Sequence, residues 1–441
     1  MKIRYNDNET IIYKNKKIQP IYSVKSSKKL FDKILRRILR NKNYKKRILV
    51  ENYNVLSVAL EDFFWQYCFQ YTKYKNFINK KGINLKITKP QNALDYQIDG
   101  YRRVRDYLNG NFNIKNILKF YIKNCLFYLW IFFNIFYKKK TWVDRRFSRD
   151  FRYVNLNFKK LSFLTLPFSL QSFRFRNLKI EKALVNDAIA KINNYKKWIF
   201  AIKFLKPKQI FLTDNLYDNF SLLLAAKLTG TKCIAISHSP NVRYHMNTFG
   251  SNLLQKKKLL LFDKIYVYHK IFKNFIVKYG YFYKKNEIDV CKWPNNNKYN
   301  FNIKKNNNNN IYILYPFEHF CNFKKINSFL TFFKSKGHKI IIKKRPDMNN
   351  YNHFDDHLNI EFINDFTKEQ ISNCFCVIGS TTTILFNLSQ NYIPIVYIKN
   401  NGYDHYEGLN CPENWLKFSS MNKKNYNQIK NFYPKAKMQL I

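Results

Sequence analysis

The chain has 441 residues and 46% hydrophobic residues, which predicts two domains with full cores and excludes a disordered protein. Its 79 Lys and Arg stand against 28 Asp and Glu, a formal net charge of +51. No zinc finger, RNP pattern or basic zipper accompanies this charge, which argues against nucleic acid as a partner and leaves an anionic membrane surface, acidic substrates or the codon bias of an A/T-rich genome to explain it.

The first part of the chain offers few clear elements. Residues 1–45 are polar and basic, which predicts an irregular lead-in without the apolar core of a signal peptide. The pattern predicts a buried strand over 47–52, a helix over 57–78 and a second strand over 85–90. The eight cysteines are scattered without metal-ligand spacing, so reduced thiols of a cytoplasmic protein are expected.

Residues 96–137 have mostly helical spacing and predict a basic, aromatic-rich helical insertion near 96–140. Its apolar core, "CLFYLWIFFNIFY" at 125–137, is shorter than the roughly 20 residues of a spanning helix. Aromatic residues and the lysines that follow suit an interfacial helix, and a buried helix of the first domain explains the run equally well. Residues 138–180 are basic and aromatic and are assigned to no element.

A regular alternation begins at residue 181. The pattern predicts helices over 181–205, 219–230 and 270–280, and strands over 209–215, 231–238, 262–269 and 287–293. Asp214 and His238 lie at the carboxyl ends of two of these strands, and Glu51 lies at the end of the strand over 47–52. These three residues are the candidates for a catalytic acid or base. Each also suits a structural or capping role.

A polar low-complexity segment at 294–310, "PNNNKYNFNIKKNNNNN", predicts a linker. Beyond it the pattern predicts strands over 311–315, 338–343, 360–363, 375–378 and 393–398, helices over 325–336, 367–373 and 382–390, and a helical, basic last segment. The fold class is therefore α/β, with Rossmann-like domains at 1–293 and 311–441. We expect the two domains to face a cleft at the carboxyl ends of their strands.

The segment "CVIGSTTTILFNLSQNYIPIVYI" at 376–398 places hydroxyl residues between a strand and a helix. The hydroxyl residues are Ser380, Thr381, Thr382 and Thr383. One of them would suffice as an N-cap, whereas four, with the backbone N–H groups of a helix start, suit a phosphate. The pattern favours the phosphate.

Two other strand ends carry polar residues in the same domain. "IIIKKRPD" at 340–347 places Lys344 and Arg345 after a strand, where cations can offset a diphosphate or form a solvated basic end. "IYILYPFEH" at 311–319 ends in Glu318 and His319, which could accept hydrogen bonds from a ribose or base or belong to a surface loop.

The blocks at 206–241, 262–297, 340–347 and 377–398 together resemble GT-B glycosyltransferases of the bacterial surface-polysaccharide type, which include sialyltransferase-, Kdo-transferase- and glycerophosphotransferase-like members. The resemblance implies that Ser380, Thr381 and Thr382 bind the phosphate of the donor. Arg345 stands at the position of a histidine in the family. Asn387 stands near the position where the family usually has a glutamate in the following helix. His238 matches the histidine of a His-Gly element.

The predicted function is transfer of a sugar from a nucleotide-activated donor, of which a CMP-sugar is one candidate, to a cell-surface glycan or lipid-linked acceptor. We expect an enzyme without metal or cofactor, cytoplasmic and peripheral at the inner face of the cell membrane. The alternatives are a CDP-polyol phosphotransferase on the same fold and a non-catalytic basic protein that binds membrane or nucleic acid.

Overall fold

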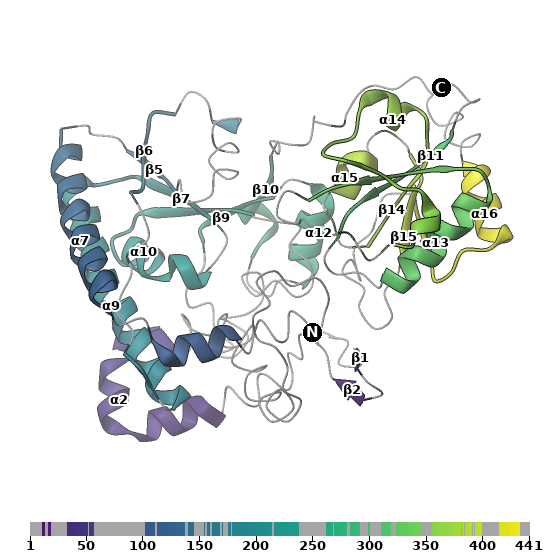
Figure 1. The fold of residues 1–441 in the computed structure, drawn as a ribbon. Helices are drawn as coiled ribbons and strands as arrows, with labels where there is room; N and C mark the ends of the chain where they lie inside the picture. The colour runs from purple at the N-terminus through teal and green to yellow at the C-terminus, as the bar shows by residue number, and fades with distance from the viewer. Residues whose placement is uncertain are drawn as a thin grey trace. The chain divides into compact units, whose positions relative to one another are not determined.

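A computed structural model gives the fold of the chain (Figure 1). It describes residues 11–13, 16–18, 33–51, 53–56, 102–110, 113–136, 140–144, 154, 157–158, 161–167, 170, 175–177, 179–213, 216–237, 262–267, 269–279, 283–291, 299, 310–318, 323–345, 351, 354–380, 382, 384–389, 391, 393–398 and 414–432. The chain divides into two compact units, and the main division falls between Trp293 and Pro294. The described residues 11–13 and 16–18 group with the second unit.

The N-terminal unit contains a six-stranded parallel sheet with the order β10-β9-β8-β7-β5-β6. Its strands are β5 (Thr141–Val143), β6 (Phe163–Thr165), β7 (Gln209–Thr213), β8 (Lys232–Ile236), β9 (Lys264–Val267) and β10 (Ile288–Val290). Counted along the chain the order is 2-1-3-4-5-6, which is a doubly wound arrangement. From β5 the next strand, β6, is added on one side, and all later strands are added on the other side, so the strand order reverses between β5 and β7.

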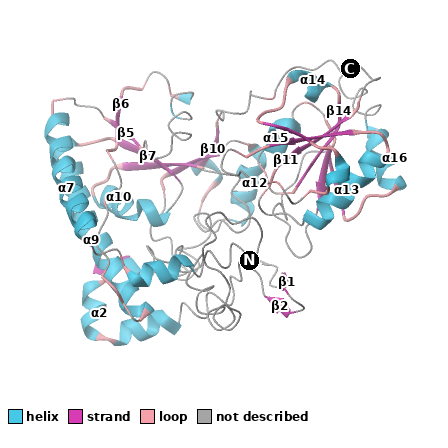
Figure 2. Ribbon diagram, viewed as in Figure 1, coloured by secondary structure: helices cyan, strands magenta, loops and turns pink. Residues whose placement is uncertain are grey.

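Long helices accompany this sheet (Figure 2). They are α7 (Ile114–Asn134), α9 (Ile180–Leu205), α10 (Leu216–Leu228) and α12 (Lys270–Tyr279). The helix α9 ends where Lys206 adopts a left-handed conformation, and the N–H group of Lys206 donates to the carbonyl of Ile202 at 2.8 Å. Pro207 follows and cannot continue the helix. The expected helices over 181–205, 219–230 and 270–280 are confirmed.

The beginning of the chain differs from the sequence predictions. Two short antiparallel hairpins are present, β1 (Ile11–Tyr13) with β2 (Lys16–Ile18) and β3 (Leu49–Val50) with β4 (Tyr53–Asn54). Residues 33–40 and α2 (Lys42–Arg47) are helical. The described residues of 1–45 are therefore not irregular, and the strand predicted over 47–52 is present only as Leu49–Val50 of a hairpin and not as a buried strand of the sheet. The predictions over 57–78 and 85–90 lie outside the described residues, whereas residues 102–109 and α7 confirm the helical character of the insertion.

The C-terminal unit contains the second six-stranded parallel sheet, with the order β13-β12-β11-β14-β15-β16. Its strands are β11 (Tyr312–Pro316), β12 (Lys339–Lys343), β13 (Glu361–Ile363), β14 (Cys374–Gly379), β15 (Ile395–Ile398) and β16 (Trp415–Phe418). Along the chain this is the order 3-2-1-4-5-6 of the Rossmann fold. Two Rossmann-like α/β domains are thus confirmed, and the cleft between them stays a prediction.

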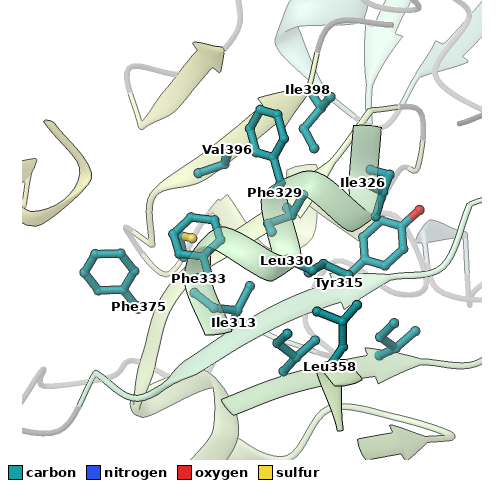
Figure 3. Close-up of a cluster of buried hydrophobic side chains, with 14 of the residues drawn as sticks. Ile313, Tyr315, Ile326, Phe329, Leu330, Phe333, Leu358, Phe375, Val396 and Ile398 are labelled. Carbon is teal, nitrogen blue, oxygen red and sulfur yellow. The ribbon is translucent and has the colours of Figure 1, made fainter. Parts of the chain in front are cut away.

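The helices of this unit are α13 (Phe323–Ser335), α14 (Lys368–Ser372), α15 (Ile384–Ser389) and α16 (Lys423–Lys430). Figure 3 shows α13 directing Ile326, Phe329 and Phe333 toward the sheet residues Ile313 and Tyr315, and all five side chains are buried. The spacing of the three α13 residues, i, i+3 and i+7, is the apolar stripe of an amphipathic helix. Ile429 of α16 belongs to the same core.

The strands and helices expected from 311 to 398 are confirmed, whereas β16 within the last segment is missed. Of the predicted linker, only Tyr299 and Asn310 are described. Tyr299 is buried and donates its hydroxyl to Asp365, while its carbonyl accepts a hydrogen bond from the Asn391 amide. Burial and the bond to Asp365 raise the pKa of Tyr299. Tyr299 therefore packs within the C-terminal unit, and the linker over 294–310 stays a prediction.

Candidate functional site

Three strand ends meet at one edge of the C-terminal sheet. The central strand β11 pairs with β12 through Pro316 and Lys343, and with β14 through Leu314 and Val377. From β11 the chain proceeds to β12 and β13 on one side, and it then returns to β14 on the other side. The point where the strand order reverses lies between β11 and β14. Ligands of open α/β sheets bind at such switch points, outside the carboxyl ends of the strands.

The carboxylate of Glu318 joins the two strands of this switch point. Glu318 lies two residues after the end of β11, and only 1% of the residue is exposed. The N–H group of Ser380 donates to both carboxylate oxygens, at 2.8 and 2.9 Å, and the Ser380 hydroxyl donates to Oε2. The N–H group of Thr382 donates to Oε1 at 3.0 Å. Three donors from a loop 62 to 64 residues away thus hold the carboxylate.

This arrangement differs from the roles that the sequence predicts. The backbone donors of Ser380 and Thr382, expected to bind a phosphate, bind the protein's own carboxylate. A carboxylate offers about four acceptor positions, and the Ser380–Thr382 loop uses them. Glu318 therefore acts here as a positioning residue, and its expected contact with a ribose or base stays a prediction. The same holds for the donor-phosphate role of the hydroxyl residues.

Gly379 makes this contact sterically possible. A Cβ atom at this position would lie 2.9 Å from Oε1 of Glu318 and 2.7 Å from a methyl group of Leu385. Both distances are shorter than real side chains tolerate. A glycine at the last position of β14 is thus required by the close approach of Glu318, whose carboxylate reaches this backbone from the end of the neighbouring strand.

Replacement of Gly379 by alanine is expected to destabilise the C-terminal unit by about 1–3 kcal/mol, because the new methyl group overpacks the site. The free energy of unfolding measured in urea checks this value. Leu385→Ala removes one of the two clashing groups. The double variant should therefore be more stable than the sum of the two single effects implies. Strict additivity would contradict the steric account.

The basic end of β12 lies beside Glu318's strand. Lys343, Lys344 and Arg345 are half-buried, and the N–H group of Phe317 donates to the carbonyl of Lys343 at 3.1 Å. The Tyr351 hydroxyl accepts from the N–H group of Arg345 at 3.0 Å and donates to its carbonyl at 3.2 Å. The Tyr351 ring also contacts Phe317, with ring centroids 5.0 Å apart. Aromatic packing thus fixes the cationic strand end next to the residue that precedes Glu318.

Several predicted site residues lie outside the described residues: His238, Asp214, His319, Thr381 and Thr383. The described ones, Glu318, Lys344, Arg345, Ser380 and Thr382, belong to three adjacent strand ends of one sheet.

Glu51 does not lie at the end of a sheet strand. It occupies the turn of the β3–β4 hairpin, where it is exposed and has a φ of 49°. Burial, and to a smaller extent the carboxylate of Glu51, raise the pKa of Tyr195 in α9. The pattern at 47–52 misled because Ile48 is fully buried while Leu49 is 42% exposed, as in a short hairpin. The proposed catalytic role of Glu51 therefore loses the strand end on which it was based.

The sequence analysis missed Asp144 at the switch point of the N-terminal sheet. Asp144 follows β5, is 2% exposed, and its N–H group donates to the carbonyl of Phe211 in β7 at 2.9 Å. The neighbouring strand end, Thr213, accepts two hydrogen bonds from the side chain of Asn219. The sequence signal for this strand is the triplet "TWV" before Asp144. Three residues are too few to stand out in the unassigned region 138–180.

Among the described residues, no three His, Cys, Asp or Glu side chains are grouped so that they could hold a metal ion. The metal-independent mechanism stays a prediction.

No protein-family model matches the sequence, and a comparison with curated proteins finds no match. The fold is similar to that of UDP-GlcNAc 2-epimerase from Methanocaldococcus jannaschii, with 10% identity, a TM-score of 0.40 and coverage of 66% of this chain and 91% of that chain. It is similar to UDP-bound MnaA of S. aureus (12% identity, 66% and 87% coverage, TM-score 0.40). It is also similar to the wall teichoic acid polymerase TagF (12%, 76% and 92%, TM-score 0.35). Likenesses this distant do not tell which activity this chain has.

Proposed function

We propose that the chain is a metal-independent glycosyltransferase whose nucleotide-activated donor binds at the carboxyl edge of the C-terminal sheet. One observation carries the proposal. The loop ordered by Glu318 and the cationic end of β12 lie on either side of the same central strand, at the switch point of a Rossmann-like sheet. The resemblance of the flanking segments to surface-polysaccharide glycosyltransferases supports the choice of reaction.

Lys344 and Arg345 are the groups that we assign to the donor phosphates. The carboxylate of Glu318 is held by hydrogen bonds from Ser380 and Thr382, and Lys344 and Arg345 are half-buried cations at the same edge. Arg in particular binds phosphate through paired N–H groups. Fixed cations at this place stabilise the negative charge that develops as the nucleotide leaves.

The N-terminal unit supplies the acceptor site and the general base in this proposal. The base takes the proton of an acceptor hydroxyl, whose oxygen attacks the anomeric carbon of the sugar, and the nucleotide departs with the bonding electrons. His238 and Asp214 remain candidates for the base, and Asp144 is added because it lies at the carboxyl edge of its sheet. The acceptor is a glycan or a lipid-linked glycan, and the enzyme works as a peripheral protein at the inner face of the cell membrane.

Exchange of both cations for alanine, Lys344→Ala with Arg345→Ala, is expected to weaken binding of CMP, CDP or UDP by at least about tenfold, because two charge-assisted hydrogen bonds are lost. Isothermal titration calorimetry measures the affinity. Lys339→Ala is the matched control, because Lys339 is exposed at the opposite end of the same strand and should not matter. Equal affinity of the double variant and the control would refute the assignment of the phosphates.

A screen of nucleotide sugars and of CDP-polyols then tests the reaction itself. Release of nucleotide with formation of a glycosidic bond supports the proposal. Transfer of a polyol phosphate from the CDP donor would show a phosphotransferase and refute the glycosyltransferase. Failure of every nucleotide to bind, with steeply salt-dependent binding of RNA or DNA instead, would refute both enzymes.

A further inference from the structure

The helix α7 carries a continuous apolar surface on its outer side. Its exposed large side chains are Ile114 (85% exposed), Leu118 (60%), Tyr121 (60%), Ile122 (49%), Leu126 (47%), Tyr128 (48%), Leu129 (49%), Phe132 (57%) and Phe133 (62%), and Phe136 (79%) follows the helix. The spacing of three and four residues places them along one broad face for the whole length of the helix. Soluble proteins rarely expose a connected apolar patch of this extent unless it binds something.

The opposite side of α7 already packs on the protein. Phe127 and Ile131 are its buried residues, and the ring of Phe127 contacts Trp198 of α9 edge to face at 5.0 Å. Lys197 of α9 donates to the side chain of Asn124. Packing of α7 onto the unit therefore accounts for one face of the helix and leaves the apolar outer face unexplained.

The apolar surface continues onto α9, which lies beside α7 (Figure 1). Tyr128 contacts Phe200 at 6.1 Å, and Phe200 stacks on Phe204 at 5.7 Å. Phe200 is 48% exposed and Phe204 53% exposed. We call the exposed apolar side chains of α7, together with Phe200 and Phe204, the α7–α9 face.

The charged residues of α7 and of the C-terminal part of α9, from residue 188 onward, are all cations. The sequence contains no Asp or Glu between residues 107 and 143 or between 188 and 213, the segments that include most of the two helices. The exposed lysines of these segments are Lys115, Lys119, Lys140, Lys196, Lys203, Lys206 and Lys208. A surface with aromatic and aliphatic side chains beside lysines complements the interface of an anionic bilayer, where the lysines meet lipid headgroups and the aromatic rings enter the boundary region.

We propose that the α7–α9 face binds a bilayer containing anionic lipids, with α7 lying in the plane of the membrane. None of the helices in the described residues is long and apolar enough to cross a membrane. The 21 residues of α7 span about 30 Å, so the helix offers a long strip of interfacial contact. This surface gives the proposed peripheral location a physical basis, and it stands on α7 and α9 alone without any catalytic activity.

A second copy of the chain suits this face less well. In a twofold dimer the same patch contacts itself, so the lysines that accompany it would approach the lysines of the partner. Like charges brought together at an interface oppose association, whereas anionic headgroups neutralise them. The charge pattern therefore favours lipid over self-association.

Vesicle cosedimentation tests the inference with the full chain. The wild-type protein is expected to bind vesicles of phosphatidylcholine with phosphatidylglycerol much more tightly than vesicles of phosphatidylcholine alone. Replacement of Phe132 and Phe133 by serine should weaken binding by at least about tenfold, because two exposed rings no longer enter the interface. Phe175→Ser is the matched control, because Phe175 is 56% exposed and lies outside both helices. Lys115→Gln with Lys119→Gln should reduce the preference for anionic lipid.

Two results would overturn the inference. One is absence of vesicle binding by the wild-type protein, or equal binding by the Phe132/Phe133 variant. The other is a wild-type homodimer in analytical ultracentrifugation that the same variant dissociates, which would assign the face to a second copy. Circular dichroism confirms that the variants fold. Nucleotide affinity measured on the same samples keeps this outcome separate from the proposed reaction, because a variant that loses vesicles should still bind nucleotide.

Discussion

Glu318→Ala is expected to destabilise the C-terminal unit by about 3–5 kcal/mol, because it removes the buried acceptor of three hydrogen-bond donors. The N–H groups of Ser380 and Thr382 and the Ser380 hydroxyl would lose their partner in a place where Ser380 is 1% exposed. Hydrogen exchange of the β14 and β11 amides measures the stability of this unit directly. The exchange of these amides should accelerate by orders of magnitude.

Two further variants distinguish the effect of losing the Glu318 carboxylate from the effect of losing any glutamate side chain. Glu318→Gln keeps one acceptor oxygen and should retain part of the stability. Glu361→Ala removes an exposed carboxylate at the start of β13 and should change little. If Glu318→Ala were no more destabilising than Glu361→Ala, the carboxylate would not hold the loop after β14. Ser380→Ala should reproduce only part of the effect, because its backbone N–H group still donates to Glu318.

The contact of Glu318 with Ser380 changes how the hydroxyl run is understood. A helix start rich in Ser and Thr predicts an anion site. The group that occupies the donors of Ser380 and Thr382 is the protein's own carboxylate, Glu318. The sequence could not reveal this, because 62 residues separate the two partners and nothing local in "YPFEH" or "GSTTT" encodes their pairing. The functional emphasis accordingly moves from the hydroxyl run to the cations after β12.

Much of the alternation could be predicted, since buried parallel strands such as "KIIIK" and "CFCVIG" are continuous apolar runs beside clearly amphipathic helices. Prediction failed where elements are short. The strands β5 and β6 have three residues each, and their place in the sheet depends on pairing with β7 and with each other. The hairpin at Glu51 failed for a related reason, because one buried residue, Ile48, gave it the pattern of a core strand.

Trp142→Ala is expected to destabilise the N-terminal unit by about 3–5 kcal/mol, because Trp142 is fully buried and its loss leaves a large cavity. Its ring contacts Trp130 of α7 at 5.5 Å and Trp198 of α9 at 6.4 Å. It thereby links α7 and α9 to β5, the strand that Asp144 follows. The alanine variant should therefore also bind anionic vesicles more weakly, while hydrogen exchange in the C-terminal unit stays unchanged.

Trp142→Phe supplies the contrast that makes this prediction specific. No described group accepts a hydrogen bond from the buried indole Nε1 of Trp142. A phenylalanine keeps most of the aromatic packing and removes this unsatisfied donor, whose burial costs about 1–3 kcal/mol. We therefore expect the phenylalanine variant to lie within about 1.5 kcal/mol of the wild type and to bind vesicles normally. If Phe and Ala were equally destabilising in urea unfolding, the indole N–H group would have to be bonded, and the link between α7 and β5 would be polar as well as aromatic.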